Sequence, residues 1–290
     1  MSDHSAAGSP PTDGAPVAAL TIDVEDWYQS CIDFDAPISE RVVRNVDSLL
    51  AALAESRVKA TFFVQGQVAE TFPSLVALLA AEGHEVQSHG HTHRPLYAMN
   101  REQLRAELTR ARQSIEDACG QAVTAFRAPD FSIVSENLWA LEVLAELGFE
   151  VDSSIFPIRM RRYGIRGWSL TPRRVGLPGG ASILEAPVSV WSLKGLRLPV
   201  GGGGYFRVFP RPLIEHALRA VAASGRPPIV YCHPYEFNAE ELNDYRTKVS
   251  SFVRFSQGLR RESLGKRLQE LVGALPFGRL DDVLAAWRLA

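Results

Sequence analysis

Short apolar segments alternate with longer amphipathic segments along most of the chain. The apolar segments have the length and continuous hydrophobicity of strands that are buried on both faces. The clearest cover residues 17–24, 60–64 and 229–232, and residues 85–88, 125–127, 151–153 and 183–186 are further, shorter strand candidates. Between them, apolar positions recur at helical spacing, which predicts helices over residues 42–53, 72–81, 101–118, 135–147 and 212–224.

Residues at the predicted helix ends support these assignments. Ser39 and Asn100 are expected to cap the first and third helices. Gly83 and Gly120 stand where a left-handed residue would end the second and third helices.

The alternation of strands and helices predicts a parallel α/β fold. Acidic, histidine and arginine residues follow different predicted strands, and in a (β/α) barrel such strand ends meet on one face. We therefore expect a barrel in preference to an open doubly wound sheet. No G-x-G-x-x-G sequence follows the first strand, so a dinucleotide cofactor is not predicted.

The composition narrows the class of protein. With 290 residues, 46% hydrophobic and 22% charged, the chain can bury a sizeable core. The formal charge is −2 and no basic stripe is evident, so nucleic acid is not an expected partner. The three cysteines share no C-x-x-C spacing, which argues against a disulfide framework and against a zinc site built from cysteines.

Residues 1–16 are rich in Pro, Ser, Gly and Ala and are expected to form a disordered leader. They lack the basic and apolar regions of a secretory signal. No segment approaches the roughly 18 apolar residues of a membrane span. We therefore expect a cytoplasmic location and no transmembrane segment.

Histidines cluster directly after the predicted strand over residues 85–88. His89 and His93 are four positions apart, so on a helical turn they would share a face and could bind one metal ion, whereas His91 would point elsewhere. For this segment alone, a polar loop with locally hydrogen-bonded histidines is the alternative.

A metal ion would need a further ligand, and the end of the first predicted strand supplies candidates. Asp23, Glu25 and Asp26 lie close together there. Carboxylates at the end of a buried strand repel one another and lose hydration, and a bound cation relieves both costs. Capping of the next element would explain one of these carboxylates but not all of them.

Segments in chain order resemble the polysaccharide deacetylase family with the NodB homology fold, carbohydrate esterase family 4. They are residues 23–26 (Asp-Val-Glu-Asp), 89–93 (His-Gly-His-Thr-His), 126–129 (Phe-Arg-Ala-Pro), 152–154 (Asp-Ser-Ser) and 230–234 (Val-Tyr-Cys-His-Pro). The resemblance implies a distorted TIM-like (β/α)7 barrel over residues 17–237. A helical C-terminal extension over residues 238–290 would pack on that barrel.

The resemblance also implies a divalent metal ion held by His89, His93 and one carboxylate. The family usually has adjacent aspartates, whereas here either Glu25 or Asp26 could be the ligand. Strand alternation places Glu25 on the same face as Asp23, but we expect Asp26 to turn inward at the strand end and to be the ligand. Zinc is the expected ion, with cobalt or another divalent ion as alternatives. Gly90 replaces the Ser or Thr that the family commonly has, which removes a hydrogen bond but no ligand.

The remaining motif residues would carry the chemistry of the family. Asp23 would be the general base and His233 the general acid in hydrolysis by a metal-activated water. By the resemblance, Arg127 would orient Asp23 and Asp152 would orient His233. A simple ion pair for Arg127, a turn cap for Asp152 and a core position for His233 are the structural alternatives.

The resemblance implies an N-acetylated sugar of a polysaccharide or glycan precursor as the substrate. Residues 201–204 are all glycine, without the Lys-Ser/Thr of a phosphate loop, and form either a flexible connector or a close backbone approach to ligand. The predicted substrate-binding residues are Pro129, Tyr205, Arg207 and Glu236. This region resembles deacetylases associated with exopolysaccharide biosynthesis.

Two other functions stay open on the sequence alone. Some relatives of this fold hydrolyse small amides, as allantoinases do, and a closed pocket would favour that function over an open trough for a polymer. An inactive carbohydrate-binding relative would be favoured if Asp23, His89 or His93 were missing, but all are present.

Overall fold

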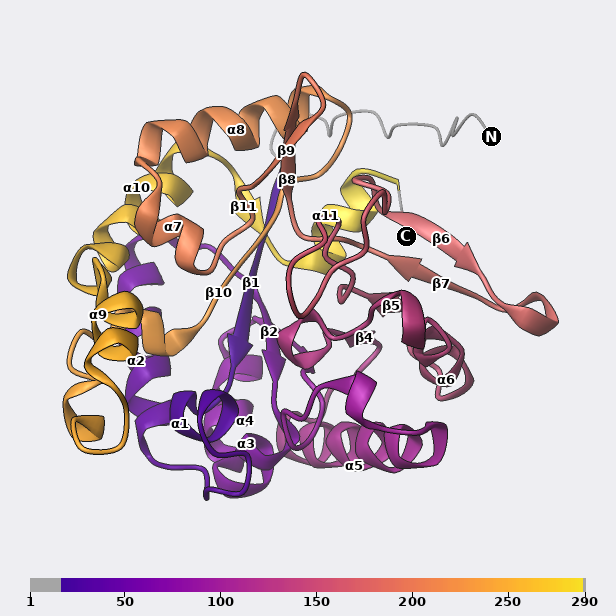
Figure 1. Cartoon of the computed structure of the whole chain (residues 1–290), viewed down its shortest axis with the longest axis horizontal. Helices are drawn as coiled ribbons and strands as arrows, with labels where there is room; N and C mark the ends of the chain where they lie inside the picture. Colours follow the sequence, from indigo (N-terminus) through magenta and orange to yellow (C-terminus); the bar gives the residue numbers. More distant parts are fainter. Residues whose placement is uncertain (1–16, 289–290) are drawn as a thin grey trace.

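A parallel sheet forms the centre of the computed structural model, which describes residues 17–288 (Figure 1). In this sheet β1 (Ala18–Val24) lies between β10 (Ile229–Cys232) and β2 (Thr61–Val64) and pairs in parallel with both. The order continues from β2 through β3 (Glu85–Ser88), β4 (Ala125–Phe126), β5 (Val151–Asp152), β7 (Ser182–Glu185) and the antiparallel β6 (Arg173–Gly176). The carboxyl ends of β1 to β5 and β10 therefore lie on one side of the molecule.

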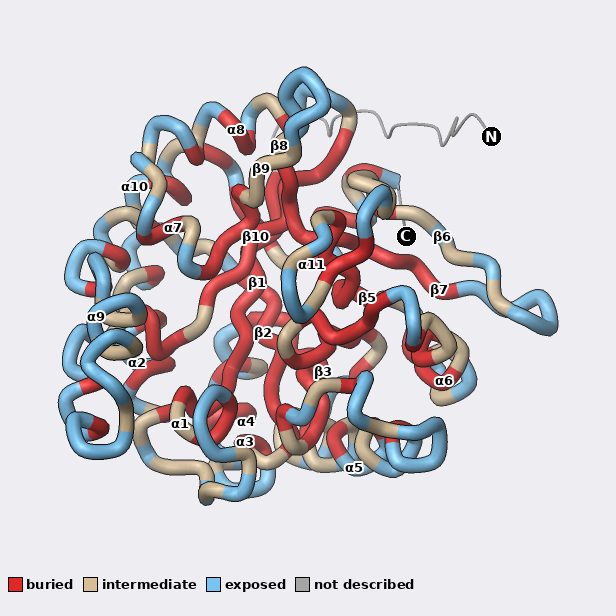
Figure 2. The backbone as a smooth tube through the Cα atoms, in the orientation of Figure 1, coloured by how far each residue is buried: buried red, intermediate tan, exposed pale blue. Residues whose placement is uncertain are grey.

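Helices surround the sheet, and the strands are the most buried part of the chain (Figure 2). The helices are α1 (Trp27–Cys31), α2 (Arg41–Leu53), α3 (Gly66–Thr71), α4 (Pro73–Ala81), α5 (Arg101–Cys119), α6 (Ala140–Glu146), α7 (Gly204–Val208), α8 (Arg211–Ala223), α9 (Ser251–Gly258), α10 (Leu264–Ala274) and α11 (Leu280–Ala286). The parallel α/β fold is therefore confirmed. Every residue of β1, β2, β3 and β10 is buried, as the continuous apolar segments predict.

Helix α5 shows how local sequence sets an element. The side chain of Asn100 accepts the N–H of Gln103 at 2.9 Å, and the Gln103 side chain accepts the N–H of Asn100 at 2.9 Å. Leu104 and Leu108 bury the inner face of the helix. Gly120 ends it in the left-handed conformation, with φ of +68°. The predicted caps of this helix are confirmed.

The sheet curls until its two ends approach each other. Ser189, which follows β7, donates its N–H to the carbonyl oxygen of Ile229 at 2.8 Å and accepts the N–H of Ile229 on Oγ at 2.7 Å. Within residues 17–288, no continuous ladder joins β6 or β7 to β10. The architecture is thus barrel-like and closed by these few contacts. The hairpin of β8 (Val190–Leu193) and β9 (Leu196–Pro199) leaves the sheet just after the contact.

Several short elements differ from the sequence prediction. The predicted strands have close counterparts, but α1, α3, β6 and the β8–β9 hairpin were not predicted. Ser39 does not cap α2, because its N–H and hydroxyl group both donate to Asp26. A capping residue can be recruited by an acceptor from a neighbouring loop, which sequence spacing alone does not reveal.

The C-terminal segment returns to the sheet. Strand β11 (Phe277–Gly278) pairs in parallel with the start of β1. Trp287 is fully buried and donates its Nε1–H to the carbonyl oxygen of Val17 at 3.1 Å. The domain boundary after residue 237 stays a prediction, and the predicted leader over 1–16 lies outside the described residues. No described helix has the length and apolar character needed to cross a membrane.

Candidate metal and hydrolase site

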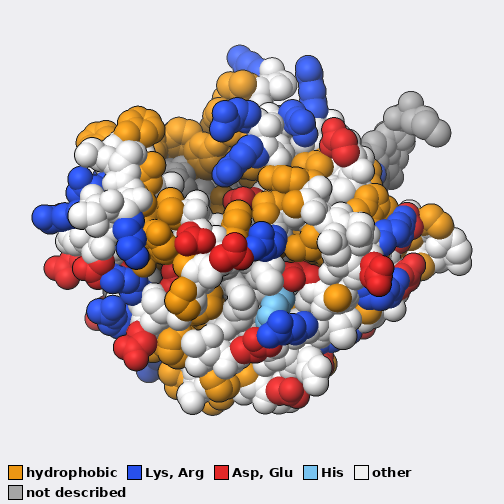
Figure 3. Space-filling view, turned by 60° about the horizontal axis from the view of Figure 1, so that its bottom comes forward, with side chains coloured by type: hydrophobic (Ala, Val, Ile, Leu, Met, Phe, Trp, Pro, Cys, Tyr) orange, Lys and Arg blue, Asp and Glu red, His pale blue; other side chains and the backbone are white. Residues whose placement is uncertain are grey.

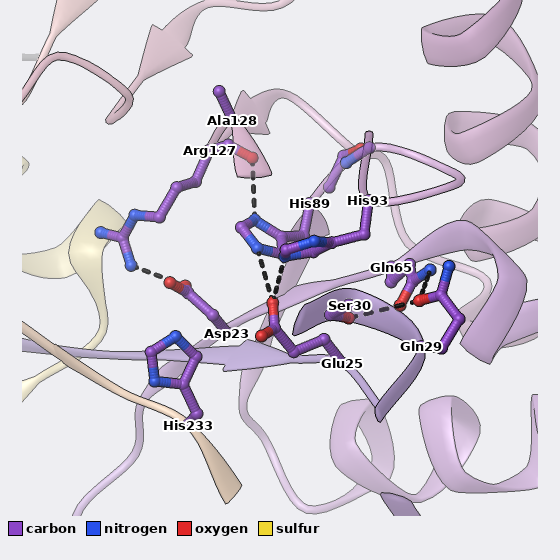
Figure 4. Close-up of polar contacts among 12 residues, drawn as sticks. Asp23, Glu25, Gln29, Ser30, Gln65, His89, His93, Arg127, Ala128 and His233 are labelled. Atoms are coloured by element: carbon purple, nitrogen blue, oxygen red, sulfur yellow. Dashed lines mark hydrogen bonds and ion pairs between the residues drawn. The ribbon is translucent and has the colours of Figure 1, made fainter. Parts of the chain in front are cut away.

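Strand β1 delivers two carboxylates to the carboxyl end of the sheet. Asp23 and Glu25 alternate along the chain, so both side chains project to the same side. Asp23 is 2% and Glu25 3% exposed. Figure 4 shows Glu25 pointing toward His89 and His93, and Asp23 pointing toward the guanidinium group of Arg127. The strand thus places two carboxylates in a region that also receives histidines from β3 and β10.

Glu25, His89 and His93 form the donor group that could hold a metal ion. One ligand atom from each of them lies within 4.8 Å of the other two, and all three residues are buried. Glu25 Oε2 is 3.2 Å from His89 Nε2 and also contacts His93 Nε2 (Figure 4). Two imidazole nitrogens and a carboxylate oxygen suit zinc, cobalt and related divalent ions.

The backbone sets which nitrogen of His89 is free. Its Nδ1 lies 2.9 Å from the carbonyl oxygen of Arg127, which can only accept a hydrogen bond. Nδ1 therefore carries the proton, and in the neutral ring Nε2 presents its lone pair toward Glu25. A backbone carbonyl holds metal-ligating histidines in this way in many proteins.

The charges of this group shift its pKa values in opposite directions. Burial alone would raise the pKa of Glu25, but the charge of His93 and the hydrogen bond from its ring hold it well below its usual value. Burial alone would lower the pKa of His93, but the neighbouring Glu25 carboxylate raises it. Glu25 is therefore ionised at neutral pH.

The histidines converge through a non-helical turn. Gly90 and His93 have φ values of +74° and +58°, so the expected helical turn is wrong although the convergence is present. Glu107 of α5 holds the turn by accepting the N–H groups of His91 and Thr92 on Oε1, at 3.0 and 2.6 Å. His91 points away, as expected, with Nε2 3.8 Å from the carboxylate of Glu70. A side chain at Gly90 would be strained, which explains glycine here.

Asp26 does not face the histidines, contrary to our expectation. It is the N-cap of α1 and accepts the N–H groups of Tyr28 and Gln29 on Oδ1, at 3.0 and 3.3 Å. Its second oxygen accepts the N–H of Ser39 at 2.9 Å. Both oxygens are thus engaged, and the carboxylate that the geometry offers to a metal ion is Glu25.

Arg127 holds Asp23, as the sequence predicts. Its Nη1 donates to Asp23 Oδ1 at 2.8 Å and to the hydroxyl group of Thr21 at 2.7 Å. Its Nη2 donates to the hydroxyl group of Ser153 at 2.9 Å, and the guanidinium lies over the ring of Phe63. The guanidinium is fully buried, so it fixes the Asp23 carboxylate in one orientation.

Glu236 and Arg207 position His233. Glu236 Oε2 is 3.1 Å from His233 Nδ1 and accepts the backbone N–H of His233 at 3.0 Å. The other Glu236 oxygen lies 3.1 Å from Arg207 Nε. Burial alone would lower the pKa of His233, but the hydrogen bond to Glu236 and the nearby Glu25 charge raise it to about 9. His233 is therefore protonated at neutral pH. Of the residues predicted to bind substrate, Glu236 contacts this histidine and Arg207 contacts Glu236.

Asp152 does not contact His233, so its predicted orienting role is not supported. It pairs in parallel register with Glu185 of β7, and both side chains are fully buried. The hydroxyl group of Ser154 donates to Asp152. Burial raises the pKa of both carboxyl groups, most strongly that of Glu185, because two adjacent buried carboxylates cannot both ionise easily. This pair can share a proton within the sheet.

A cavity of about 210 Å³ opens over these residues. Figure 3 views the end of the molecule at which β1 terminates, and a histidine side chain is visible on that face. The cavity is lined by Asp23, Glu25, Cys31, His89, His93, Ala128, Asp130, Phe131, Arg162, Tyr163, Tyr231, His233, Tyr235 and Gln257. Pro129 and Tyr205, both predicted to bind substrate, are not among the described residues that line it.

Some of these lining residues could have been found in the sequence. Tyr231 lies two positions before His233 on a strand, so alternation places both on one side. Arg162, Tyr163 and Gln257 come from loops and a helix far along the chain, and no local pattern predicts their approach. Asp130 has a φ of +55°, a conformation that the sequence did not indicate.

The first three of the four consecutive glycines, residues 201–203, pack against β10. A Cβ atom on Gly202 would lie 1.8 Å from the carbonyl oxygen of Tyr231, and one on Gly203 would lie 2.7 Å from its hydroxyl group. Gly203 also donates its N–H to that carbonyl oxygen at 3.1 Å. The predicted close approach therefore exists, but it is to Tyr231, a lining residue, and the segment is not a loose connector.

Comparison with known families divides the chain into two parts. Residues 12–151 match the family described as Polysaccharide deacetylase. Residues 153–285 match a family described as a domain of unknown function, DUF3473. Asp23, Glu25 and the two converging histidines thus fall within the first match, whereas His233 falls within the second.

Individual relatives cover only part of the chain. A chitooligosaccharide deacetylase from Rhizobium leguminosarum bv. trifolii is 33% identical over 138 residues, which is 48% of this chain and 56% of the relative. A peptidoglycan-N-acetylglucosamine deacetylase from Bacillus cereus is 34% identical over 95 residues, which is 32% of this chain and 34% of the relative. The matched region therefore spans about half or less of these curated relatives.

A solved structure from Mycobacterium smegmatis aligns with nearly the whole chain. A Mycobacterium smegmatis protein assigned to the polysaccharide deacetylases has a TM-score of 0.63 and 21% sequence identity, covering 97% of this chain and 94% of the other. The two proteins share a fold across both parts of the chain.

Proposed function

We propose that the protein is a metal-dependent hydrolase that removes acetyl groups from N-acetylated sugars, a function supported by the match of residues 12–151 to the polysaccharide deacetylase family. The observation that carries the proposal is the buried group of Glu25, His89 and His93 beside the Asp23 carboxylate that Arg127 holds. The substrate class is a polysaccharide or a glycan precursor, in keeping with the saccharides named for the relatives.

The donor group fits a divalent metal ion, with zinc or cobalt the best match. Glu25 is ionised, and the hydrogen bond from His89 to the Arg127 carbonyl leaves the other nitrogen of His89 free. His93 Nδ1 has no hydrogen-bond partner among the described residues, so its ring is free to present Nε2 to an ion. A cation among these three groups would satisfy lone pairs that otherwise face one another.

Each residue of the site then has a defined task. A divalent ion held by Glu25, His89 and His93 would supply Lewis-acid activation of a water molecule and of the acetyl carbonyl group. Asp23 accepts the proton of the water, and Arg127 holds its carboxylate in one orientation. His233, protonated at neutral pH, donates a proton to the leaving amine nitrogen. Glu236 holds His233 Nδ1, so Nε2 is the nitrogen that donates.

Release of acetate from acetylated oligosaccharides tests this function. We expect activity on N-acetylglucosamine oligomers that a chelator abolishes and zinc or cobalt restores. Asp23→Asn should lower kcat on the order of a hundredfold or more with the fold intact, because it removes the base. Asp26→Asn, whose side chain still caps α1, is the matched control and should keep most of the activity.

Two results would overturn the proposal. One is full deacetylation by protein shown to be free of metal. The other is hydrolysis of allantoin, with no acetate released from any acetylated saccharide, which would assign the site to small amides.

A further inference from the structure

Positive charge is concentrated in the middle of the C-terminal half. Of the 31 Lys and Arg residues in the chain, ten lie within residues 153–214, whereas only one of the 33 Asp and Glu residues, Glu185, lies there. Glu185 is fully buried and pairs with Asp152. The exposed charge of this segment is therefore almost entirely positive, in a protein whose net charge is −2.

The densest part of this charge is the loop between β5 and β6. Arg159, Arg161, Arg162 and Arg166 are all exposed. None of them forms an ion pair with an acidic side chain of residues 17–288, although many other arginines of the protein do. Figure 3 shows Lys and Arg side chains gathered along the upper edge of the face that holds the site. Unpaired arginines kept together in this way repel one another unless an anion binds among them.

A groove of about 660 Å³ collects three of the cationic side chains. Arg159 and Arg166 line it from the β5–β6 loop, and Arg197 lines it from β9. The same loop provides Arg162 and Tyr163 to the cavity that contains Asp23 and the histidines. One loop therefore forms part of both walls, which places the groove next to the candidate site.

The loop is held in shape by hydrogen bonds. Arg197 Nη1 donates to the carbonyl oxygens of Pro157 and Trp168, at 2.6 and 3.1 Å. Across the loop, the N–H of Ile165 donates to the carbonyl oxygen of Phe156 at 2.9 Å. The guanidinium groups of Arg159 and Arg166 thus project from a fixed backbone, which lowers the entropy cost of binding a ligand.

We propose that this groove binds the anionic groups, carboxylate or phosphate, of a saccharide whose acetylated sugar occupies the candidate site. Arginine presents a planar set of N–H donors that matches both anions and neutralises their charge. The inference rests on the proposed function and narrows its substrate from N-acetylated sugars in general to acidic ones.

Binding of matched acidic and neutral saccharides to the full chain tests the proposal. A hyaluronan tetrasaccharide and chitotetraose have equal length and both contain N-acetylglucosamine, but only hyaluronan carries carboxylates. UDP-N-acetylglucosamine and free N-acetylglucosamine form the corresponding pair for phosphate. By calorimetric titration we expect at least one acidic probe to bind on the order of tenfold more tightly than its neutral partner. The preference should weaken as salt is added, and the pair that shows it identifies the anion.

Reversing the charge of the groove arginines tests whether they cause the preference for acidic saccharides. Arg159→Glu with Arg166→Glu should abolish the difference between acidic and neutral probes. The control is Arg44→Glu with Lys266→Glu, which changes the net charge equally at exposed positions on α2 and α10 and should leave the preference intact. A preference that survives the groove variant, or is absent from the wild-type protein, overturns the proposal.

Binding to a lipid surface is a distinct outcome. Leu193 and Leu196 of the β8–β9 hairpin are 46% and 60% exposed and flank Lys194. If the protein binds phosphatidylglycerol vesicles through Arg159 and Arg166 and none of the acidic saccharides, the groove proposal is wrong. Failure of the proposed deacetylase function can be distinguished from failure of the groove proposal. In that case the protein would still bind acidic saccharides through the arginines but would release no acetate.

Discussion

At the scale of single residues, the site combines expected and unexpected partners. Arg127 contacts Asp23, as the family resemblance implies, and it supplies the cation that a buried carboxylate requires. The partner of His233 was assigned to Asp152, whereas the structure provides Glu236, three positions along the chain. The sequence His-Pro-Tyr-Glu contained this information, since a short helical turn brings positions i and i+3 together. The contact between His233 and Glu236 depends on the short helical turn over Pro234–Phe237, which was not predicted from the sequence.

Glu236→Gln should lower the pKa of His233 from about 9, because it removes the carboxylate charge that raises it. In the wild-type protein, the raised pKa keeps the proton on His233 until the pH passes about 9. In the variant, His233 loses this proton, and with it the role of general acid, at a lower pH. We expect the alkaline limb of the kcat/KM profile to move to lower pH. The His233 signal in a nuclear magnetic resonance titration should move with it.

Asp152→Asn is the matched comparison for this variant. Its carboxyl group contacts Glu185 and Ser154, not His233, so the alkaline limb should stay in place. An unchanged profile in Glu236→Gln together with a shifted profile in Asp152→Asn would show that the predicted partner is correct and the observed one is not.

At the scale of elements, the long amphipathic helices and the buried strands were predictable, and the short connections were not. Strands such as β2 are short apolar segments with clear boundaries, and α5 has both of its caps in the sequence. Helix α1 has only five residues, too few for a periodic pattern to emerge. The turn over residues 89–93 depends on Glu107, a contact from a different element. Such long-range hydrogen bonds have no local signature.

Glu85, at the start of β3, is a buried carboxyl group that makes the stability of the folded protein depend on pH. Burial and the charge of Asp281 raise its pKa to about 7. The folded state therefore favours the protonated form of Glu85. The resulting stabilisation is complete below the pKa of glutamate in the unfolded chain, about 4.3, and it is lost as the pH rises through 7. Between pH 5 and pH 8 the wild-type protein should lose on the order of 2 kcal/mol of its free energy of unfolding through this group, measured by urea unfolding. Glu85→Gln should not show this loss.

The control for this prediction is Glu150→Gln, an exposed position before β5. That variant should keep the pH dependence of the wild-type protein. Parallel stability curves for the wild-type protein and Glu85→Gln would contradict a raised pKa at Glu85.

At the scale of the whole molecule, the site is assembled from both matched parts of the chain. The part matching the deacetylase family supplies Asp23, Glu25, His89 and His93. The part matching DUF3473 supplies His233 and the arginine-rich loop beside the cavity. The order of motifs predicted that strand ends would meet, because parallel strands share one edge. Which side chains then face the same cavity depends on how the sheet curls, and no local pattern encodes that curvature.

The central claim is that Glu25, together with His89 and His93, holds a divalent metal ion. The most direct measurement is the zinc content of purified full-length protein after chelation, reloading and removal of free metal. The wild-type protein and Asp26→Asn should each retain about one zinc ion per chain, whereas Glu25→Ala should retain far less with its fold preserved. Full zinc content in Glu25→Ala, with loss of zinc in Asp26→Asn, would contradict the account.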